Sequence, residues 1–119
     1  MSGNNVILDT NIVLYILGGK YDVSNLPEGN CIISFVTEIE LLSYPLLNLQ
    51  EERKIKNFLD NIDVVGIDQK IKEKTIHFRK KYKLKIPDAI VCATSYCKRG
   101  VLVTKDKDLK KVLEVNINF

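Results

Sequence analysis

The chain has little of several residue types that mark specialised proteins. Its 119 residues include one histidine, three prolines and three cysteines, and no apolar run reaches the length of a membrane span. Because Cys31, Cys92 and Cys97 are odd in number and lack C-x-x-C spacing, they fit buried reduced thiols better than a disulfide framework or a zinc site. The start MSGNNV also lacks the basic segment of a signal peptide. We therefore expect a cytoplasmic protein with no membrane partner.

The composition is that of an ordinary globular protein. Hydrophobic residues make up 45% of the chain and charged residues 28%, which excludes the disordered and collagen-like classes. A chain of this length buries roughly two-thirds of the surface that its unfolded form exposes, so we expect a single domain over residues 1–119. The net charge of +3 is mild, and it permits a nucleic-acid partner without arguing for one.

Two kinds of apolar pattern alternate along the chain. Short runs rich in β-branched residues predict strands at residues 5–8, 31–36, 62–67, 101–104 and 115–119. Apolar residues at helical spacing predict helices at residues 11–19, 37–47, 49–61, 69–83, 86–100 and 107–113. Thr37 is the expected N-cap of the second helix, and Pro45 should end or kink that helix.

Strands that alternate with helices, with no hairpin dipeptide between neighbouring strands, predict the α/β class. Their connections should be right-handed crossovers, and the sheet should be mostly parallel and covered on both faces. In such a sheet the functional crevice lies beyond the carboxyl ends of the strands. Asp9 ends the first strand, so its carboxylate should point into that crevice.

Three other segments bring acidic residues to the same edge. Glu40 follows the second strand, Asp88 lies in the first turn of the helix at 86–100, and Asp106 and Asp108 follow the fourth strand. A cluster of carboxylates repels itself, so it must hold protons or bind a cation. Oxygen ligands without a matching histidine or cysteine favour Mg²⁺ or Mn²⁺.

Each acid also has a purely structural explanation. Thr37 and Glu40 fit a T-x-x-E capping box, and Asp88 would favour a helix N-terminus through the helix dipole. Asp9 could cap the first helix, and either Asp106 or Asp108 could cap the helix at 107–113. Caps account for one acid per helix, but they do not explain why the segments sharing one edge all carry carboxylates.

Four motifs carry a family resemblance. VILDTNIVL, ISFVTEIELL, IPDAIVCATS and VLVTKDKDL resemble, in order and spacing, the acidic motifs of PIN-domain ribonucleases, and the small size is similar to VapC toxins of type II toxin-antitoxin systems. The resemblance implies a three-layer α/β/α sandwich with a mostly parallel sheet of about five strands, and metal-dependent RNA cleavage. It implies the following catalytic acids, the aspartates among them holding Mg²⁺ or Mn²⁺: Asp9, Glu40, Asp88 and Asp106. It also implies supporting roles for Asn11, Ser34, Thr37, Thr104 and Asp108.

Lysines near these motifs are candidate RNA ligands, although solvated helix faces would explain them equally well. They are Lys80, Lys81, Lys83, Lys85, Lys105 and Lys107. VapC-like proteins generally dimerise and are inhibited by a cognate antitoxin, so the resemblance implies a homodimer and an antitoxin partner. Alternatives are an antitoxin-independent RNA-processing PIN nuclease, or a degenerate PIN module that binds without cutting. A receiver-like phosphotransfer domain would need paired acids on the first loop, which NNVILDTN does not supply.

Overall fold

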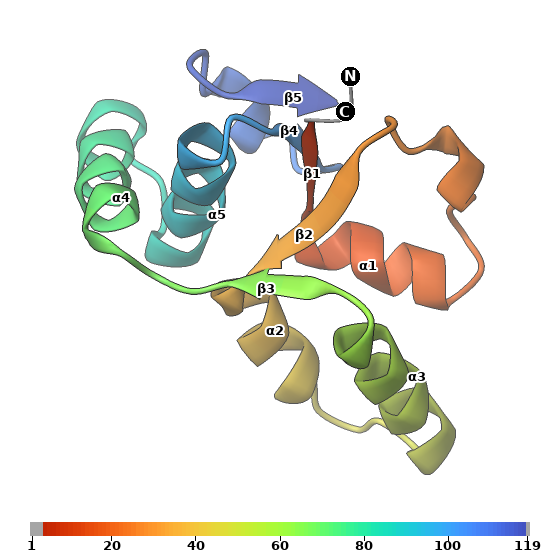
Figure 1. Ribbon diagram of the computed structural model, residues 1–119. Helices are drawn as coiled ribbons and strands as arrows, with labels where there is room; N and C mark the ends of the chain where they lie inside the picture. Colours follow the sequence, from red (N-terminus) through yellow and green to blue (C-terminus); the bar gives the residue numbers. More distant parts are fainter. Residues whose placement is uncertain (1–3, 119) are drawn as a thin grey trace.

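Strands and helices alternate along residues 4–118, the part of the chain that the computed structural model describes (Figure 1). The strands are β1 (Asn5–Leu8), β2 (Asn30–Ser34), β3 (Asp63–Val65), β4 (Val101–Val103) and β5 (Asn116–Asn118). The helices are α1 (Thr10–Leu17), α2 (Phe35–Leu42), α3 (Leu49–Asp60), α4 (Gln69–Tyr82) and α5 (Ile86–Cys97). Short 3₁₀ turns occupy Val23–Asn25 and Leu109–Lys111. Phe119 of the predicted fifth strand lies outside the described residues.

The five strands form one fully parallel sheet in the order β3-β2-β1-β4-β5. The central strand is β1, in which Ile7 is paired with Ile32 of β2 on one side and with Leu102 of β4 on the other. All the carboxyl ends therefore meet at one edge. The predicted α/β class and parallel sheet are confirmed. The order of the strands in the sheet places the carboxyl ends of β1, β2 and β4 side by side.

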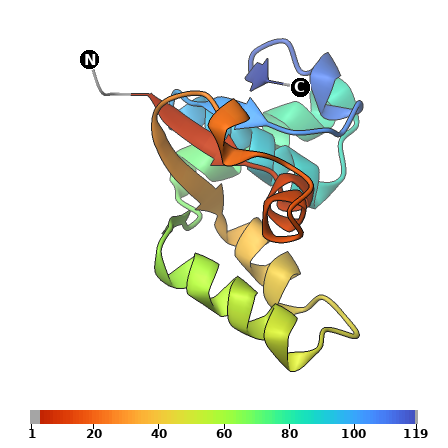
Figure 2. The ribbon, with the colours of Figure 1, turned by 90° about the vertical axis from the view of Figure 1, so that its right-hand side faces the viewer.

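Alternate residues of the strands face two separate hydrophobic cores, as the period of two in a strand requires. Ile7 and Leu102 pack with α4 and α5, whereas Val6, Leu8 and Val103 pack with α1 and α3. Figure 1 shows α4 and α5 on one side of the sheet and α1 on the other. The result is a three-layer α/β/α sandwich. Figures 1 and 2 both show α2 and α3 side by side at one end of the molecule.

The second helix begins earlier than its sequence predicts. Ser34 is the N-cap, and its Oγ accepts a hydrogen bond from the Val36 amide at 3.1 Å. The assignment of Thr37 as the N-cap was therefore wrong, and so was the capping box with Glu40. The apolar run that ends in Phe35 and Val36 suggested a longer strand, but a serine able to cap the following amide stops the strand there.

Other element ends follow their local signals more closely. The first helix ends at Leu17, and Gly18 is its C-cap. The second ends at Leu42, shortly before Pro45. The helix predicted at 107–113 is reduced to a single 3₁₀ turn, Leu109–Lys111, because the side chains of Thr104 and Asp106 hold the preceding residues in turns, as described below.

Gly100 permits α5 to end directly against the central strand. A Cβ atom at this position would lie 2.3 Å from Ile7 Cδ1 and 2.7 Å from the Asn5 carbonyl oxygen. No real side chain has contacts that short, so only glycine allows this approach. The close packing fixes α5 relative to β1, and therefore fixes Asp88 relative to Asp9.

Candidate active site

Asp9 lies at the carboxyl edge of the sheet, as predicted, and it joins two strand ends. It directly follows β1 and is the N-cap of α1, where its Oδ1 accepts a hydrogen bond from the Thr10 amide at 2.9 Å. Its Oδ2 accepts a hydrogen bond from Thr104 Oγ1 at 2.6 Å. Thr104 directly follows β4, so this contact spans the two neighbouring strands. Both carboxylate oxygens of Asp9 are thus held in place.

The segment after β4 is folded by a chain of side-chain contacts. Thr104 is fully buried, and its Oγ1 accepts a hydrogen bond from the Asp106 amide at 3.0 Å. Asp106 Oδ1 in turn accepts a hydrogen bond from the Asp108 amide at 2.9 Å. Asp108 precedes the 3₁₀ turn but makes no capping bond with its side chain. Thr104 therefore orients Asp9 and Asp106 together, whereas Asp108 remains exposed.

Glu40 reaches the site through a residue that sequence reasoning missed. The Thr10 hydroxyl donates a hydrogen bond to Glu40 Oε1 at 2.5 Å and lies 3.1 Å from the hydroxyl of Thr37. Thr37 is fully buried in α2. Thr10 is the middle residue of the D-T-N motif, which drew attention to Asp9 and Asn11. Nothing in the D-T-N motif indicated that its threonine would link α1 to α2 by a hydrogen bond.

Asp88 is close enough to the other acids for their charges to act on it. It is half-buried in the first turn of α5. Its pKa is raised to about 6, mainly by burial and further by the charges of Asp106, Asp9 and Glu40, while Lys85 opposes the rise. The structure therefore brings together all four of the acids that the sequence placed at one edge.

The pKa of Asp9 is set by the same kinds of effect as the pKa of Asp88. Burial raises its pKa most, hydrogen bonds from Thr104 and Thr10 lower it, and the charges of Asp106 and Glu40 raise it again. Burial, together with the charges of Asp88, Asp9 and Asp106, also raises the pKa of the Cys92 thiol to about 12, so this thiol is protonated at neutral pH. Negative charge at this edge is thus concentrated and only partly compensated.

The donor set suits a hard divalent cation. The charged groups are carboxylates, and among residues 4–118 no lysine, arginine or histidine forms an ion pair with any of the four. Over the same residues, no three acids, thiols or imidazoles converge closely enough to enclose an ion by themselves. Mg²⁺ commonly keeps several waters and takes only one or two protein carboxylates, so such an ion does not require three acids to converge.

The remaining supporting residues differ in their surroundings. Ser34 is fully buried and its hydroxyl is used as the cap of α2. Asn11 is exposed in the first turn of α1. Cys31, Cys92 and Cys97 are free thiols, and only Cys92 is fully buried, so the expectation of three buried thiols holds for one of them.

The predicted RNA ligands differ in their contacts. Lys85 precedes α5 and lies near enough to Asp88 to oppose the rise in its pKa, and Lys105 places its Nζ 6.0 Å from the centre of the Tyr21 ring. Lys81 instead forms an ion pair with Glu114 at 3.0 Å. Lys80, Lys83 and Lys107 are exposed. The long-range contact of Lys81 had no signal in the sequence.

The fold and the four motifs agree with one protein family over nearly the whole chain. The PIN domain family matches residues 6–114. The chain belongs to the PIN domain family. The described part of this PIN domain, residues 4–118, has no helix with both the length and the apolar character needed to cross a bilayer.

Several solved structures share the fold of this PIN domain. A toxin-antitoxin complex from Klebsiella pneumoniae is 29% identical, with a TM-score of 0.77, and the match covers 92% of this chain and 94% of that one. VapBC-1 from nontypeable Haemophilus influenzae is 21% identical, with a TM-score of 0.81 and 96% of each chain covered. VapBC2 from Rickettsia felis, bound to a promoter DNA fragment, is 18% identical, with a TM-score of 0.80 and coverage of 96% and 97%. No curated protein matches the sequence.

Proposed function

We propose that this PIN domain is a metal-dependent endoribonuclease and the toxin of a toxin-antitoxin pair. The observation that carries the proposal is the convergence of Asp9, Glu40, Asp88 and Asp106, from four distant segments, at one edge with their charges raising the pKa of Asp88. Structural caps do not require that convergence. Membership of a family whose members are generally nucleases supports the same conclusion.

Asp9, Asp88 and Asp106 are the residues that would hold Mg²⁺ or Mn²⁺, one or two of them directly and the rest through bound water. Such an ion supplies Lewis-acid stabilisation of the negative charge that develops on a phosphodiester during hydrolysis. Thr104 fixes the orientation of Asp9 and of the Asp106 backbone. Thr10 holds Glu40 at the rim of the site, where its carboxylate is placed to orient a water molecule or to complete the ligand set.

An RNA substrate would approach a site that is acidic at its centre and basic around it. Lys85 lies beside Asp88 and Lys105 follows Thr104. These two lysines are therefore the members of the predicted RNA-binding set with the best position to attract the phosphates on either side of the cut. Lys81, which is paired with Glu114, is the weakest member.

An antitoxin partner fits the same edge. A partner arginine would neutralise the acid cluster by charge-assisted hydrogen bonds. Two apolar residues of α2, Ile39 and Leu42, are each 56% exposed beside Glu40, which offers apolar contact next to the charges. The Klebsiella pneumoniae relative is described as a toxin-antitoxin complex, and this supports the assignment here. We also propose that the protein is a homodimer and that it acts in the cytoplasm.

Cleavage of total RNA by the isolated chain tests this function. We expect fragments with Mg²⁺ or Mn²⁺ and none with EDTA, and we expect Asp9→Asn to remove the activity. Asp63→Asn is the matched control, because Asp63 is exposed at the start of β3, an outer strand of the sheet that is separated from β1 by β2.

The outcome also separates the alternatives. Metal-dependent cleavage with no small protein bound in the native host would favour an RNA-processing nuclease that lacks an antitoxin. Absence of cleavage from a well-folded chain in both metals would make this a binding module, and the nuclease proposal would be wrong.

A further inference from the structure

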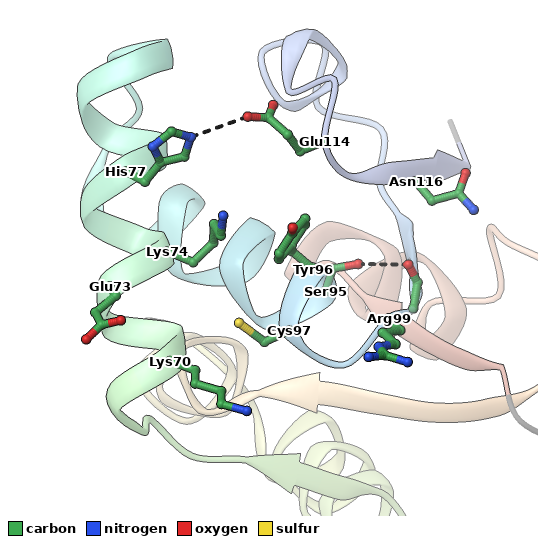
Figure 3. A pocket seen from close by; sticks show the side chains of 11 residues that line it. Lys70, Glu73, Lys74, His77, Ser95, Tyr96, Cys97, Arg99, Glu114 and Asn116 are labelled. Carbon is green, nitrogen blue, oxygen red and sulfur yellow. Dashed lines mark hydrogen bonds and ion pairs between the residues drawn. The ribbon is translucent and has the colours of Figure 1, made fainter.

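A second candidate site lies at the far end of α5 from the acids. A cavity of about 810 Å³ opens between α4, the C-terminal end of α5 and the segment leading into β5 (Figure 3). Asp88 lies in the first turn of α5 and Tyr96 in its last turn, and a helix rises about 1.5 Å per residue. The cavity is therefore roughly 12 Å along the helix from Asp88. Its volume is in the range of small-molecule sites, about 300 to 1,000 Å³.

Cationic side chains without carboxylate partners line this cavity. Lys70 and Lys74 come from α4, and Arg99 follows α5. Within residues 4–118, none of the three is within ion-pair distance of an acid. Figure 3 shows Lys70 and Lys74 on the α4 side of the cavity and Arg99 across from them, beyond Cys97. A ligand in the cavity would therefore meet positive charge from several directions.

The nearby acids are already engaged elsewhere. Glu114 accepts hydrogen bonds from Tyr82 and Lys81 and lies 3.4 Å from His77 Nε2. These contacts hold the pKa of Glu114 at about 2. Glu73 accepts a hydrogen bond from Nε2 of the Gln69 side chain, and Figure 3 shows its carboxylate directed away from the cavity. Asp68 caps α4 through the Ile71 amide. The cations of the cavity therefore remain available to an anion.

An oriented aromatic ring is part of the same cavity. Tyr96 is 42% exposed, yet Phe78 packs edge-on against its ring with the centres 6.0 Å apart. Lys74 Nζ lies 4.3 Å from the centre of the Tyr96 ring. Lys74 thus lies over one face of a partly exposed ring, and an aromatic ring together with a cation is the combination used to bind nucleotides.

Arg99 occupies a position that normally favours glycine. Its φ is 53°, in the left-handed region, immediately after the helix end where glycine is common. A residue other than glycine is disfavoured in this conformation. Arg99→Gly therefore removes the arginine side chain from the cavity without straining the backbone.

We propose that this cavity binds a nucleotide unit, with its base against Tyr96 and its phosphate near Lys70 and Arg99. The unit has two possible sources of the same chemistry: a free mononucleotide, or one residue of a single-stranded RNA. If the bound unit is one residue of an RNA strand, the cavity extends the proposed nuclease function, and the proposal rests on that function. Binding of a free mononucleotide does not depend on it.

Binding measured in EDTA tests the proposal without cleavage. AMP is titrated by calorimetry, and a fluorescein-labelled short single-stranded RNA is titrated by anisotropy at several salt concentrations. The test variant is Lys70→Ala/Arg99→Gly, in which the glycine suits the backbone at 99. The matched control is Lys20→Ala/Arg53→Ala, which removes the same charge from exposed residues outside the cavity. Tyr96→Leu tests stacking, with Tyr96→Phe as its conservative partner.

We expect the double variant to weaken binding about tenfold more than the control does. Loss of the contacts to this one phosphate should reduce the slope of log affinity against log salt for RNA by about 0.7. Tyr96→Leu should weaken binding at least about fivefold, and Tyr96→Phe should restore it. If the cavity variants weaken AMP binding in this way, the cavity is a mononucleotide site. If they weaken only the binding of RNA, the cavity is part of the path of the RNA strand.

The proposal is overturned if wild type binds neither ligand, or if the double variant and the control bind both ligands equally. These binding results do not depend on the acidic residues of the candidate active site, because cleavage by the Mg²⁺-loaded wild type is measured separately. Loss of cleavage in Asp9→Asn together with unchanged binding across the cavity variants would refute the cavity site and leave the nuclease proposal intact.

Discussion

Replacing Asp88 with asparagine should make the metal-free protein more stable while removing its cleavage activity. The folded state holds the pKa of Asp88 at about 6, against an ordinary value of 3.8. A carboxyl whose pKa is raised by folding destabilises the fold when it is ionised. The full effect is present above the folded pKa and is lost as the pH falls through 6 toward 3.8.

The size of the effect follows from that pKa. A rise of about two units corresponds to about 3 kcal/mol. Because Asp88 is only half-buried, solvent screening reduces this to about 1 to 2 kcal/mol. Asparagine also loses the favourable interaction of a carboxylate with the N-terminus of α5, about 0.3 to 1 kcal/mol. The net gain is about 1 kcal/mol, which raises the Tm of a domain of this size by about 4 °C.

Thermal unfolding in EDTA checks this reasoning. At pH 7.5 Asp88→Asn should melt above wild type, and the difference should shrink as the pH is lowered toward 4. Asp63→Asn, at an exposed strand start, should show no such gain. Mg²⁺ should stabilise wild type more than Asp88→Asn. If Asp88→Asn melts at or below wild type in EDTA at pH 7.5, the carboxylates do not repel one another as argued.

Two further substitutions test other parts of the structure. Thr104→Val removes the hydrogen bonds that hold Asp9 and the Asp106 backbone, so metal affinity should fall about 10- to 100-fold. Cleavage should also need a higher pH, because the bond from Thr104 lowers the pKa of Asp9; an unchanged pH profile would contradict this. Gly100→Ala should destabilise the fold by about 1 to 3 kcal/mol in urea unfolding, whereas Gly66→Ala, with no atom within 4 Å of its added Cβ, should not. Equal midpoints would refute the close packing of α5 on β1.

The positions of the principal acids could be predicted because strong local signals placed them. The run ending at Asp9 is short, apolar and followed by a helical pattern, so its strand end was unambiguous. Asp88 follows a proline at a helix start, which fixed it in a first turn. A parallel sheet then brings such residues to one edge by topology alone.

Contacts between distant segments could not be predicted in the same way. The bridge from Thr10 to Glu40 and the bond from Thr104 to Asp9 join residues 30 and 95 positions apart, and no periodicity reports such pairs. The start of α2 at Phe35 was missed because apolar residues suit a buried strand and a buried helix turn equally. The pairing of Lys81 with Glu114 likewise depends on how α4 lies against the segment before β5.

The central claim is that the carboxyl edge of the sheet holds a divalent cation, and calorimetric titration with Mn²⁺ at pH 7.5 tests it most directly. Wild type should bind the ion, Asp9→Asn and Asp88→Asn should each weaken binding at least about tenfold, and Asp63→Asn should bind as wild type does. Mn²⁺ affinity that is the same in all four proteins would contradict the claim and leave these acids with structural roles alone.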